Sequence, residues 1–223
     1  FKREHFIKKN IGLIKKKIFE SNNYDFFKKK IEIFIIDNCN SLVPEEFPEK
    51  YIHLIHNKNV GGAGGFTRGL IEIKKKSKIL GITHALLMDD DIVVEPESIY
   101  RTWCLLSILK TEYKEAFVGG AMLRLDHQNI QVECGAIWNR GELLGRKAGL
   151  DLRGVEPCLY NEVEETIEYT AWWYTALPLS VVREDNLPIP IFIRGDDVEY
   201  GMRNARRIIT MNSICVWHEP FEN

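Results

Sequence analysis

Apolar, β-prone segments that alternate with helical ones constrain the fold of this chain more than any other sequence feature. Residues 31–38 (IEIFIIDN) and 84–91 (HALLMDDD) are apolar on both faces and end in polar side chains, as buried strands do where they meet a loop. The same patterns predict a shorter strand at 51–57 and helices over about 4–30, 66–80 and 97–110. This order predicts βαβ units, and therefore an α/β fold with a mainly parallel central sheet, flanked by helices, whose strands bind ligands at their carboxyl ends.

The second half of the chain is less regular. Strands are expected at 118–123 (VGGAML) and 131–138, and mostly loop over 143–168. The 223 residues, 45% of them hydrophobic, can bury one core, and no repeat or linker divides them, so residues 1–223 are expected to form a single domain. A doubly wound nucleotide-binding domain normally begins with a strand. Because this sequence begins directly before a helix, the opening strand is expected to be absent, and with it part of the ligand site.

Three adjacent carboxylates, Asp89, Asp90 and Asp91, follow the apolar strand. Like charges at close range repel and must be neutralised by protonation or by a cation. Carboxylate oxygens suit Mg²⁺ or Mn²⁺, and such an ion bridging a diphosphate would offset the charge on a departing nucleotide. The alternative is an exposed acidic turn that caps the next helix, and the flanking apolar strand argues against it.

A glycine-rich stretch, Gly61, Gly62, Gly64 and Gly65 around Ala63, precedes a predicted helix. Its backbone N–H groups could approach a ligand closely or cradle an anion. The stretch matches no standard phosphate-binding fingerprint, and a structural turn would use the same residues, so both interpretations stay open. Arg68, one turn into that helix, is a candidate phosphate partner.

A second acidic pair, Asp196 and Asp197, stands at the start of a predicted helix far along the chain. Carboxylates at that position are good helix caps, and they could also supply a general base that takes the proton from an acceptor hydroxyl. His218 ends another apolar run, where a neutral imidazole could complete a metal site. A lone histidine is more often structural, but the acidic residues elsewhere in the chain favour a role for His218 as a metal ligand.

Trp172, Trp173 and Tyr174 are consecutive aromatic residues. Aromatic faces stack on the apolar faces of sugar rings, but three in a row serve equally well as core or interface. The sequence leaves both interpretations open.

The charge balance gives no indication of a nucleic-acid partner, because 30 basic and 32 acidic residues give a formal charge of −2. Lysines nevertheless crowd the first thirty positions: Lys8, Lys9, Lys15, Lys16, Lys17, Lys28, Lys29 and Lys30. A solvated helix face is the favoured interpretation, and contact with anionic lipid is the alternative. The five cysteines are scattered and odd in number, which fits a reducing cytoplasm. The sequence has no apolar run of about 18 residues and no signal-peptide core. We therefore expect a cytoplasmic protein that is soluble or peripheral at the inner membrane face.

The motifs taken in order resemble family 2 glycosyltransferases of the GT-A fold. The resemblance covers nearly the whole chain and rests on DNCN (37–40), NKNVGGAGGFTRG (57–69), LLMDDDIVVEP (86–96), AWWYTALP (171–178), FIRGDDVEYGMR (192–203) and WHEPF (217–221). Within that family the three aspartates, the tryptophan pair and the second acidic stretch look most like bacterial galactofuranosyltransferases. Those enzymes use UDP-galactofuranose and invert at the anomeric carbon. The family's opening strand, and the C-terminal helical region of its larger members, have no counterpart in this sequence.

The resemblance implies a role for each matching residue. Asp89 and Asp91 would contact the metal, Mn²⁺ or Mg²⁺, and the donor diphosphate, with His218 as a further ligand. Asp197 would be the general base, and Asp196 would orient acceptor or donor hydroxyls. The expected donor site comprises Asp37 facing the uracil, together with Asn59, Gly61, Gly62, Gly65, Arg68, Asp89, Asp90, Trp172 and Trp173. The implied partners are a UDP-sugar and a glycan or lipid-linked glycan acceptor at the cell surface.

Three alternatives remain beside this assignment. A rhamnosyl or other hexosyl transferase shares most of the motifs. A sugar nucleotidyltransferase would need an early glycine-rich loop with a basic residue, whereas here the glycines come after the second strand. A non-catalytic nucleotide-sugar or glycan-binding scaffold would not need both acidic pairs intact. The sequence leaves open the linkage, the processivity and whether the chain forms a homo-oligomer.

Overall fold

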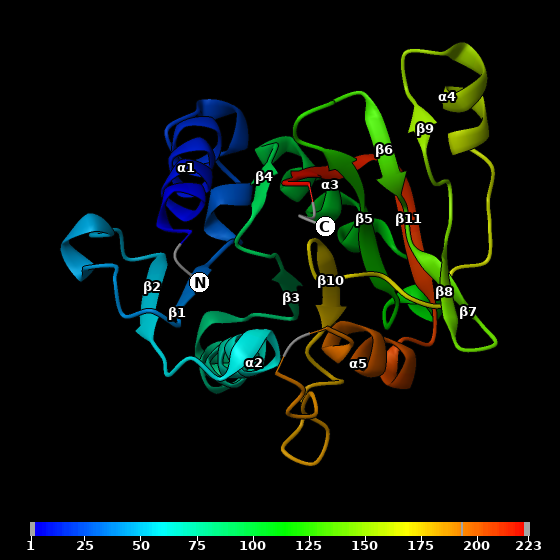
Figure 1. The fold of residues 1–223 in the computed structure, drawn as a ribbon. Helices are drawn as coiled ribbons and strands as arrows, with labels where there is room; N and C mark the ends of the chain where they lie inside the picture. The colour runs from blue at the N-terminus through cyan, green and yellow to red at the C-terminus, as the bar shows by residue number, and fades with distance from the viewer. Residues whose placement is uncertain (1–2, 193, 221–223) are drawn as a thin grey trace.

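The computed structural model describes residues 3–192 and 194–220, and Figure 1 traces their helices and strands. The helices are α1 (Glu4–Ile14), α2 (Gly61–Leu80), α3 (Pro96–Ile108), α4 (Val155–Asn161) and α5 (Asp196–Asn204). The strands are β1 (Ile33–Asp37), β2 (Ile52–His56), β3 (His84–Leu87), β4 (Ile92–Val94), β5 (Phe117–Arg124), β6 (Ile130–Glu133), β7 (Ala136–Asn139), β8 (Glu142–Gly145), β9 (Leu150–Asp151), β10 (Thr175–Pro178) and β11 (Ile208–His218). The α/β class is confirmed.

β1 and β2 form a parallel two-stranded sheet of their own, which confirms the strands expected there. Asp37 lies opposite His56 at its carboxyl end. α2 packs on β1, and Gly69 of α2 makes this approach close, because a Cβ at that position would lie 3.3 Å from the side chain of Ile36. Asp37 and His56 therefore lie side by side at the carboxyl edge of this sheet.

The larger sheet has seven strands in the order β3-β10-β5-β11-β4, with β6 and β9 continuing from β5. Every pair in it is antiparallel except β5–β11. The expectation of a mainly parallel sheet was therefore wrong for this sheet. The physical reason is that β10 enters between β3 and β5 running in the opposite direction, so each of these strands hydrogen-bonds to a reversed strand instead of to the other.

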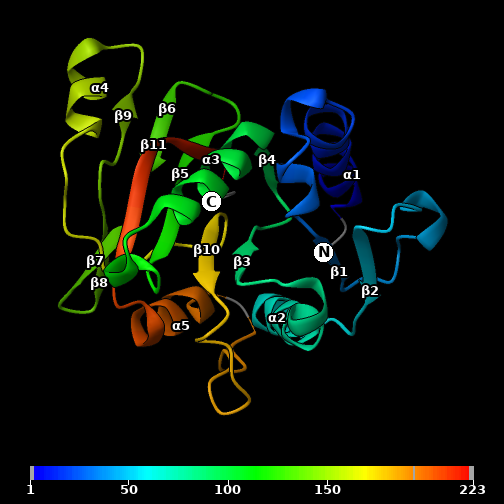
Figure 2. The ribbon, with the colours of Figure 1, turned by 180° about the vertical axis from the view of Figure 1, so that it is seen from behind.

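Helices cover one face and one end of the larger sheet. α3 packs against β11, and Figure 2 shows it crossing one face of the sheet, while α2 and α5 lie together along one end. Tyr174 is fully buried against Gly120 of β5, where a Cβ would lie 2.6 Å from the tyrosine ring. The Tyr174 hydroxyl lies 2.7 Å from the hydroxyl of Thr102 on α3. Gly120 thus leaves room for the ring of Tyr174, which connects β5 to α3.

The stretch expected to be mostly loop, 143–168, instead contains β8, β9 and α4. A buried polar network organises this stretch: Nε2 of Gln131 donates to the carbonyl of Lys147 at 2.9 Å and to Oδ1 of Asn161 at 3.1 Å. Apolar periodicity cannot reveal elements that are held by amide hydrogen bonds. The strand expected at 131–138 is split into β6 and β7 at Gly135, whose φ is +79°.

The helix expected over 4–30 ends earlier, because α1 continues only through a π-helical turn (Lys15–Phe19) before short 3-10 turns. Four of its neighbouring lysines pair with carboxylates: Lys8 with Glu46, Lys15 with Glu49, Lys17 with Glu95 and Lys28 with Asp25. These pairs fit a solvated, ion-paired face. Among the described residues, none of the helices combines the length and apolarity that crossing a membrane requires.

Candidate active site

Asp89, Asp91 and His218 converge from two strands that are far apart in the sequence. The aspartates lie in the turn between β3 and β4, and His218 ends β11, where it is paired with Ile92 of β4. One ligand atom from each of the three side chains lies within 4.8 Å of the others. Nε2 of His218 is 3.2 Å from Oδ1 of Asp91. Two carboxylates and an imidazole at this spacing suit a divalent cation such as Mn²⁺ or Mg²⁺.

Burial makes this cluster electrostatically demanding. Desolvation, followed by the charge of Asp91, raises the pKa of Asp89 to about 7. Burial also works against ionisation of Asp91, yet the hydrogen bond and charge of His218, with the charge of Arg3, hold its pKa below the ordinary value. Ionisation of Asp89 is therefore the unfavourable step in this cluster, and a bound cation would stabilise its ionised form. The donor set and its environment therefore fit a metal.

The imidazole of His218 is oriented by its neighbours. Its Nδ1 donates to the carbonyl of Glu219 at 2.5 Å, which directs Nε2 towards Asp91. The ring of Trp173 lies edge-on to it, with centroids 6.3 Å apart. His218 is only 4% exposed. A fixed tautomer of this kind is typical of histidines that bind metals.

Arg3 also belongs to this cluster, although no sequence motif indicated it. Its Nη1 lies 2.9 Å from Oδ1 of Asp90 and 2.8 Å from Oδ2 of Asp91. A single arginine at the start of a lysine-rich helix carries no motif of its own, so only the fold reveals this contact.

The second acidic pair, Asp196 and Asp197, begins helix α5. Gly195, with φ of +88°, directs the chain into α5, so that Asp196 and Asp197 begin the helix. The charge of Asp197 adds a smaller effect to burial and the charge of Asp91 in raising the pKa of Asp89, so Asp197 is near enough to interact electrostatically with that carboxylate. Asp196 is 8% exposed, and burial together with Asp197 raises its pKa. The fold therefore brings together the two acidic pairs that are more than a hundred residues apart in the printed sequence.

Two further groups around Asp197 were missed by sequence reasoning. The buried Tyr169 donates its hydroxyl to Oδ2 of Asp197 at 2.5 Å, and burial followed by the Asp197 charge raises the pKa of this tyrosine. Burial, followed by the charge of Asp197, raises the pKa of Glu133 to about 7. Tyr169 stands three residues before the tryptophan pair, and Glu133 ends a strand, as Asp37 does, which is the one signal that could have suggested it.

The glycine-rich stretch forms the first turn of α2 and serves packing. A Cβ on Gly61 would lie 2.0 Å from the carbonyl oxygen of Phe192, and φ of Gly61 is +79°. A Cβ on Gly65 would lie 2.9 Å from the side chain of Asn38. Gly62 donates its N–H to Phe192 O at 3.1 Å, and a Cβ there would lie 3.4 Å from Asp196. These glycines bring the start of α2 against the segment that leads to α5.

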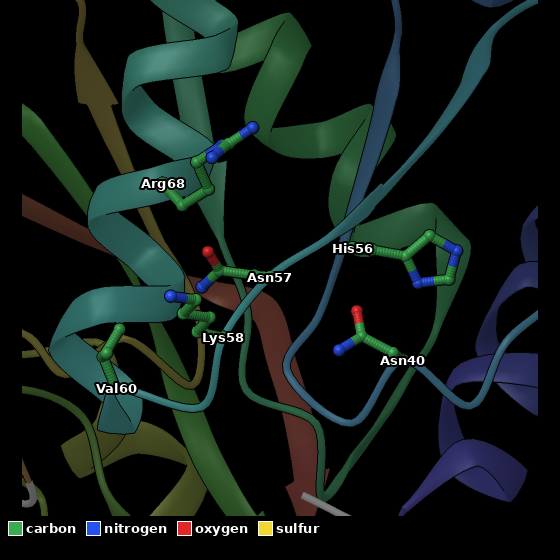
Figure 3. Close-up of a pocket in the computed structure, with 6 residues that line it drawn as sticks. All are labelled: Asn40, His56, Asn57, Lys58, Val60 and Arg68. Atoms are coloured by element: carbon green, nitrogen blue, oxygen red, sulfur yellow. The ribbon is translucent and has the colours of Figure 1, made fainter.

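A pocket of about 470 Å³ opens where β1 and β2 end (Figure 3). It is lined by Asn40, His56, Asn57, Lys58, Val60 and Arg68. Arg68 also pairs with Glu72 at 3.1 Å. The lining offers amide, imidazole and cationic groups and no carboxylate, which suits a polar, anionic ligand.

Asp37 lies beside this pocket, but its carboxylate organises the loop. It accepts hydrogen bonds from the backbone N–H groups of Cys39 and Leu42, both at 2.9 Å, and is 5% exposed. Nδ1 of His56 lies 3.6 Å from it. Asn59 acts similarly at the start of α2, where its side chain accepts the N–H of Gly61.

The first turn of α1 links the pocket to the acidic cluster. Ser41, next to the pocket residue Asn40, donates to Glu4 at 2.6 Å, and Arg3 contacts Asp90 and Asp91. A ligand with one end at each place would therefore run past the start of α1.

Trp172 and Trp173 are core residues in this structure. Trp172 is 2% exposed and packs against Phe66 and Tyr200. Trp173 is 9% exposed and donates its indole N–H to Gly120 O. Trp173 supports His218, whereas Trp172 holds α2 and α5 against the sheet.

Comparison with known proteins relates the chain to glycosyltransferases. It is 30% identical over 182 residues to the galactofuranosyltransferase GlfT2 of Mycolicibacterium smegmatis, and 29% identical over 181 residues to GlfT2 of Mycobacterium tuberculosis. Each match covers 74% of this chain and 27% of the relative, so the chain spans about a quarter of the length of these proteins. No family model matches the chain. Among solved structures, the crystal structure of A197 from STIV covers 86% of each chain at 12% identity and a TM-score of 0.45.

Proposed function

We propose that this chain is the catalytic part of an inverting glycosyltransferase that moves galactofuranose from UDP-galactofuranose to a hydroxyl of a glycan acceptor. The observation that carries the proposal is the convergence of Asp89, Asp91 and His218, whose ligand atoms lie within 4.8 Å of one another, with Asp197 near enough for its charge to act on Asp89. The similarity to two galactofuranosyltransferases supports the class of reaction and favours this donor sugar.

The acidic cluster is the proposed site of the leaving group. Asp89, Asp91 and His218 would hold Mn²⁺ or Mg²⁺, which neutralises the charge that develops on a departing diphosphate. Asp90 and Arg3 border this place. The nucleotide would extend past the start of α1 towards the pocket at Asn40, His56 and Arg68.

Asp197 is the proposed general base. A single displacement at the anomeric carbon needs a base that removes the proton from the acceptor hydroxyl as it attacks. Tyr169 and the N–H of Val198 hold the two oxygens of Asp197 at 2.5 and 2.8 Å. The carboxylate is thus fixed in orientation. We expect the half-buried Glu133, whose pKa is raised by burial and then by the charge of Asp197, to bind a sugar hydroxyl. Asp196, beside the base, would orient hydroxyls of either substrate.

The direct test is UDP release from a donor. UDP-galactofuranose and UDP-galactopyranose are each supplied with Mn²⁺ and short galactofuranose-containing oligosaccharides, and UDP and chain extension are measured. Release and extension with UDP-galactofuranose alone support the proposal. Turnover of the pyranose donor in preference would overturn the choice of sugar, and binding of UDP-sugars without any turnover would favour a non-catalytic binding module.

A further inference from the structure

Arg3 places a positive charge on a carboxylate of the candidate metal site. Its Nη1 bridges Oδ1 of Asp90 at 2.9 Å and Oδ2 of Asp91 at 2.8 Å. The other oxygen of Asp91, Oδ1, lies 3.2 Å from Nε2 of His218. Both oxygens of a residue in the candidate metal site are therefore shared with positively charged or N–H-bearing groups of the protein itself.

A guanidinium and a divalent cation cannot both contact this cluster at no cost. Two positive charges a few ångströms apart repel, and the interaction is stronger where the carboxylates are buried. The side chain of Asp91 is only 13% exposed, whereas that of Arg3 is 42% exposed. The guanidinium can therefore rotate into solvent, whereas the carboxylate of Asp91 stays enclosed by the protein.

The backbone beneath Arg3 is held in place independently of this contact. Asn10 of α1 donates its amide to Ile92 O at 2.7 Å and accepts the N–H of Val94 at 3.1 Å, which ties the helix to β4. Displacement of Arg3 therefore requires rotation of one long side chain and no movement of α1.

We propose that Arg3 is a built-in counter-ion of the acidic cluster that competes with the divalent metal, so that metal binding displaces its guanidinium from Asp91. This inference rests on the proposed function, because it takes Asp89, Asp91 and His218 as the metal site. Arg3 stabilises the metal-free fold and lowers metal affinity, and the metal releases a cation beside the place where an anionic leaving group would form.

The test is a titration of Mn²⁺ into the metal-free chain, followed by electron paramagnetic resonance of the free ion. Arg3→Gln should bind Mn²⁺ about threefold to tenfold more tightly than the wild type, as expected for loss of partly exposed ion pairs. Arg153→Gln is the matched control, because Arg153 is 75% exposed and pairs with Asp151 of β9 at 2.6 Å. Its Mn²⁺ affinity should equal that of the wild type.

The outcomes separate this inference from the proposed function. Equal affinity in the wild type and Arg3→Gln would overturn competition by Arg3 and leave the metal site intact. Failure of both proteins to bind Mn²⁺ would overturn the metal site itself. Binding by Arg3→Gln alone would be the strongest support.

Thermal unfolding keeps the test valid if the variant is destabilised. In EDTA, Arg3→Gln should melt below the wild type, because the carboxylates lose their counter-ion. In saturating Mn²⁺ the difference should shrink, since both proteins then carry the same cation. A difference that persists unchanged in Mn²⁺ would mean a merely structural ion pair and would contradict the proposal.

Discussion

The hydroxyl of Tyr169 donates a hydrogen bond to Oδ2 of Asp197 at 2.5 Å, and this contact orients the proposed base. Oδ1 is held by the N–H of Val198 at 2.8 Å. The two donors come from different parts of the chain, one from the segment before β10 and one from α5 itself. The base is therefore oriented by the tertiary fold.

Tyr169→Phe should lower turnover by about tenfold, which corresponds to the loss of one hydrogen bond to a charged group. UDP affinity should stay unchanged, because Tyr169 contacts the base and not the metal ligands. Steady-state kinetics and UDP titration check both parts. A loss confined to UDP affinity would contradict the positioning role.

Asp197→Asn should reduce turnover by roughly a hundredfold to ten-thousandfold, the usual contribution of a general base. The amide cannot accept the proton, yet it preserves the shape of the site, so UDP binding should persist. Asp185→Asn is the control, since Asp185 is 77% exposed and pairs with Arg183 on the surface. Full turnover in Asp197→Asn would remove this residue from the mechanism.

Glu133→Gln should change how stability depends on pH. In the folded chain the pKa of Glu133 is raised from 4.5 to about 7, first by burial and then by the charge of Asp197. The folded state therefore holds a proton that the unfolded state releases, and stability falls as pH rises from about 4.5 to about 7.

The variant carries no such titration. Urea unfolding should give similar stabilities for the wild type and Glu133→Gln near pH 4.5, and a more stable variant at pH 8. If the wild type were as stable as Glu133→Gln at pH 8, or more stable, the raised pKa of Glu133 would be contradicted.

Gly61→Ala should destabilise the fold by about 2 kcal/mol or more, because a positive φ and a close contact combine there. The new Cβ would lie 2.0 Å from Phe192 O. Gly12→Ala is the matched control within α1, where no atom of residues 3–192 or 194–220 lies within 4 Å of the new Cβ, apart from Gly12 itself, its chain neighbours and the adjoining helix backbone. That substitution should stabilise the chain by ~0.5–1 kcal/mol, and chemical denaturation distinguishes the two. A neutral Gly61→Ala would argue against the packing role of the glycine turn.

The sequence predicted the features that local pattern encodes. Residues 33–37 and 84–87 are strands because both of their faces are apolar, and 96–108 is a helix that starts with a proline. The carboxylates after β3 and the histidine after β11 were selected by their position at strand ends, and the fold brings them together. The reversal of β10, by contrast, depends on which strand it pairs with, and no local pattern specifies that.

The candidate site shows the same division. Arg3 and Tyr169 were missed because each acts through a contact across a long sequence separation, and neither stands in a motif of its own. The tryptophan pair gave an ambiguous signal, since a buried ring and a sugar-stacking ring look alike in sequence. Both rings are buried in this structure, and their contact with a sugar stays a prediction.

The most direct measurement is calorimetric titration of UDP into the chain with and without Mn²⁺, repeated on Asp91→Ala. The account predicts that UDP binds in the presence of Mn²⁺, that binding weakens strongly without it, and that Asp91→Ala abolishes the metal-dependent part, because Asp91 is shared by His218 and the proposed metal. UDP binding that is equally strong without Mn²⁺ and in Asp91→Ala, or no UDP binding under any condition, would contradict it.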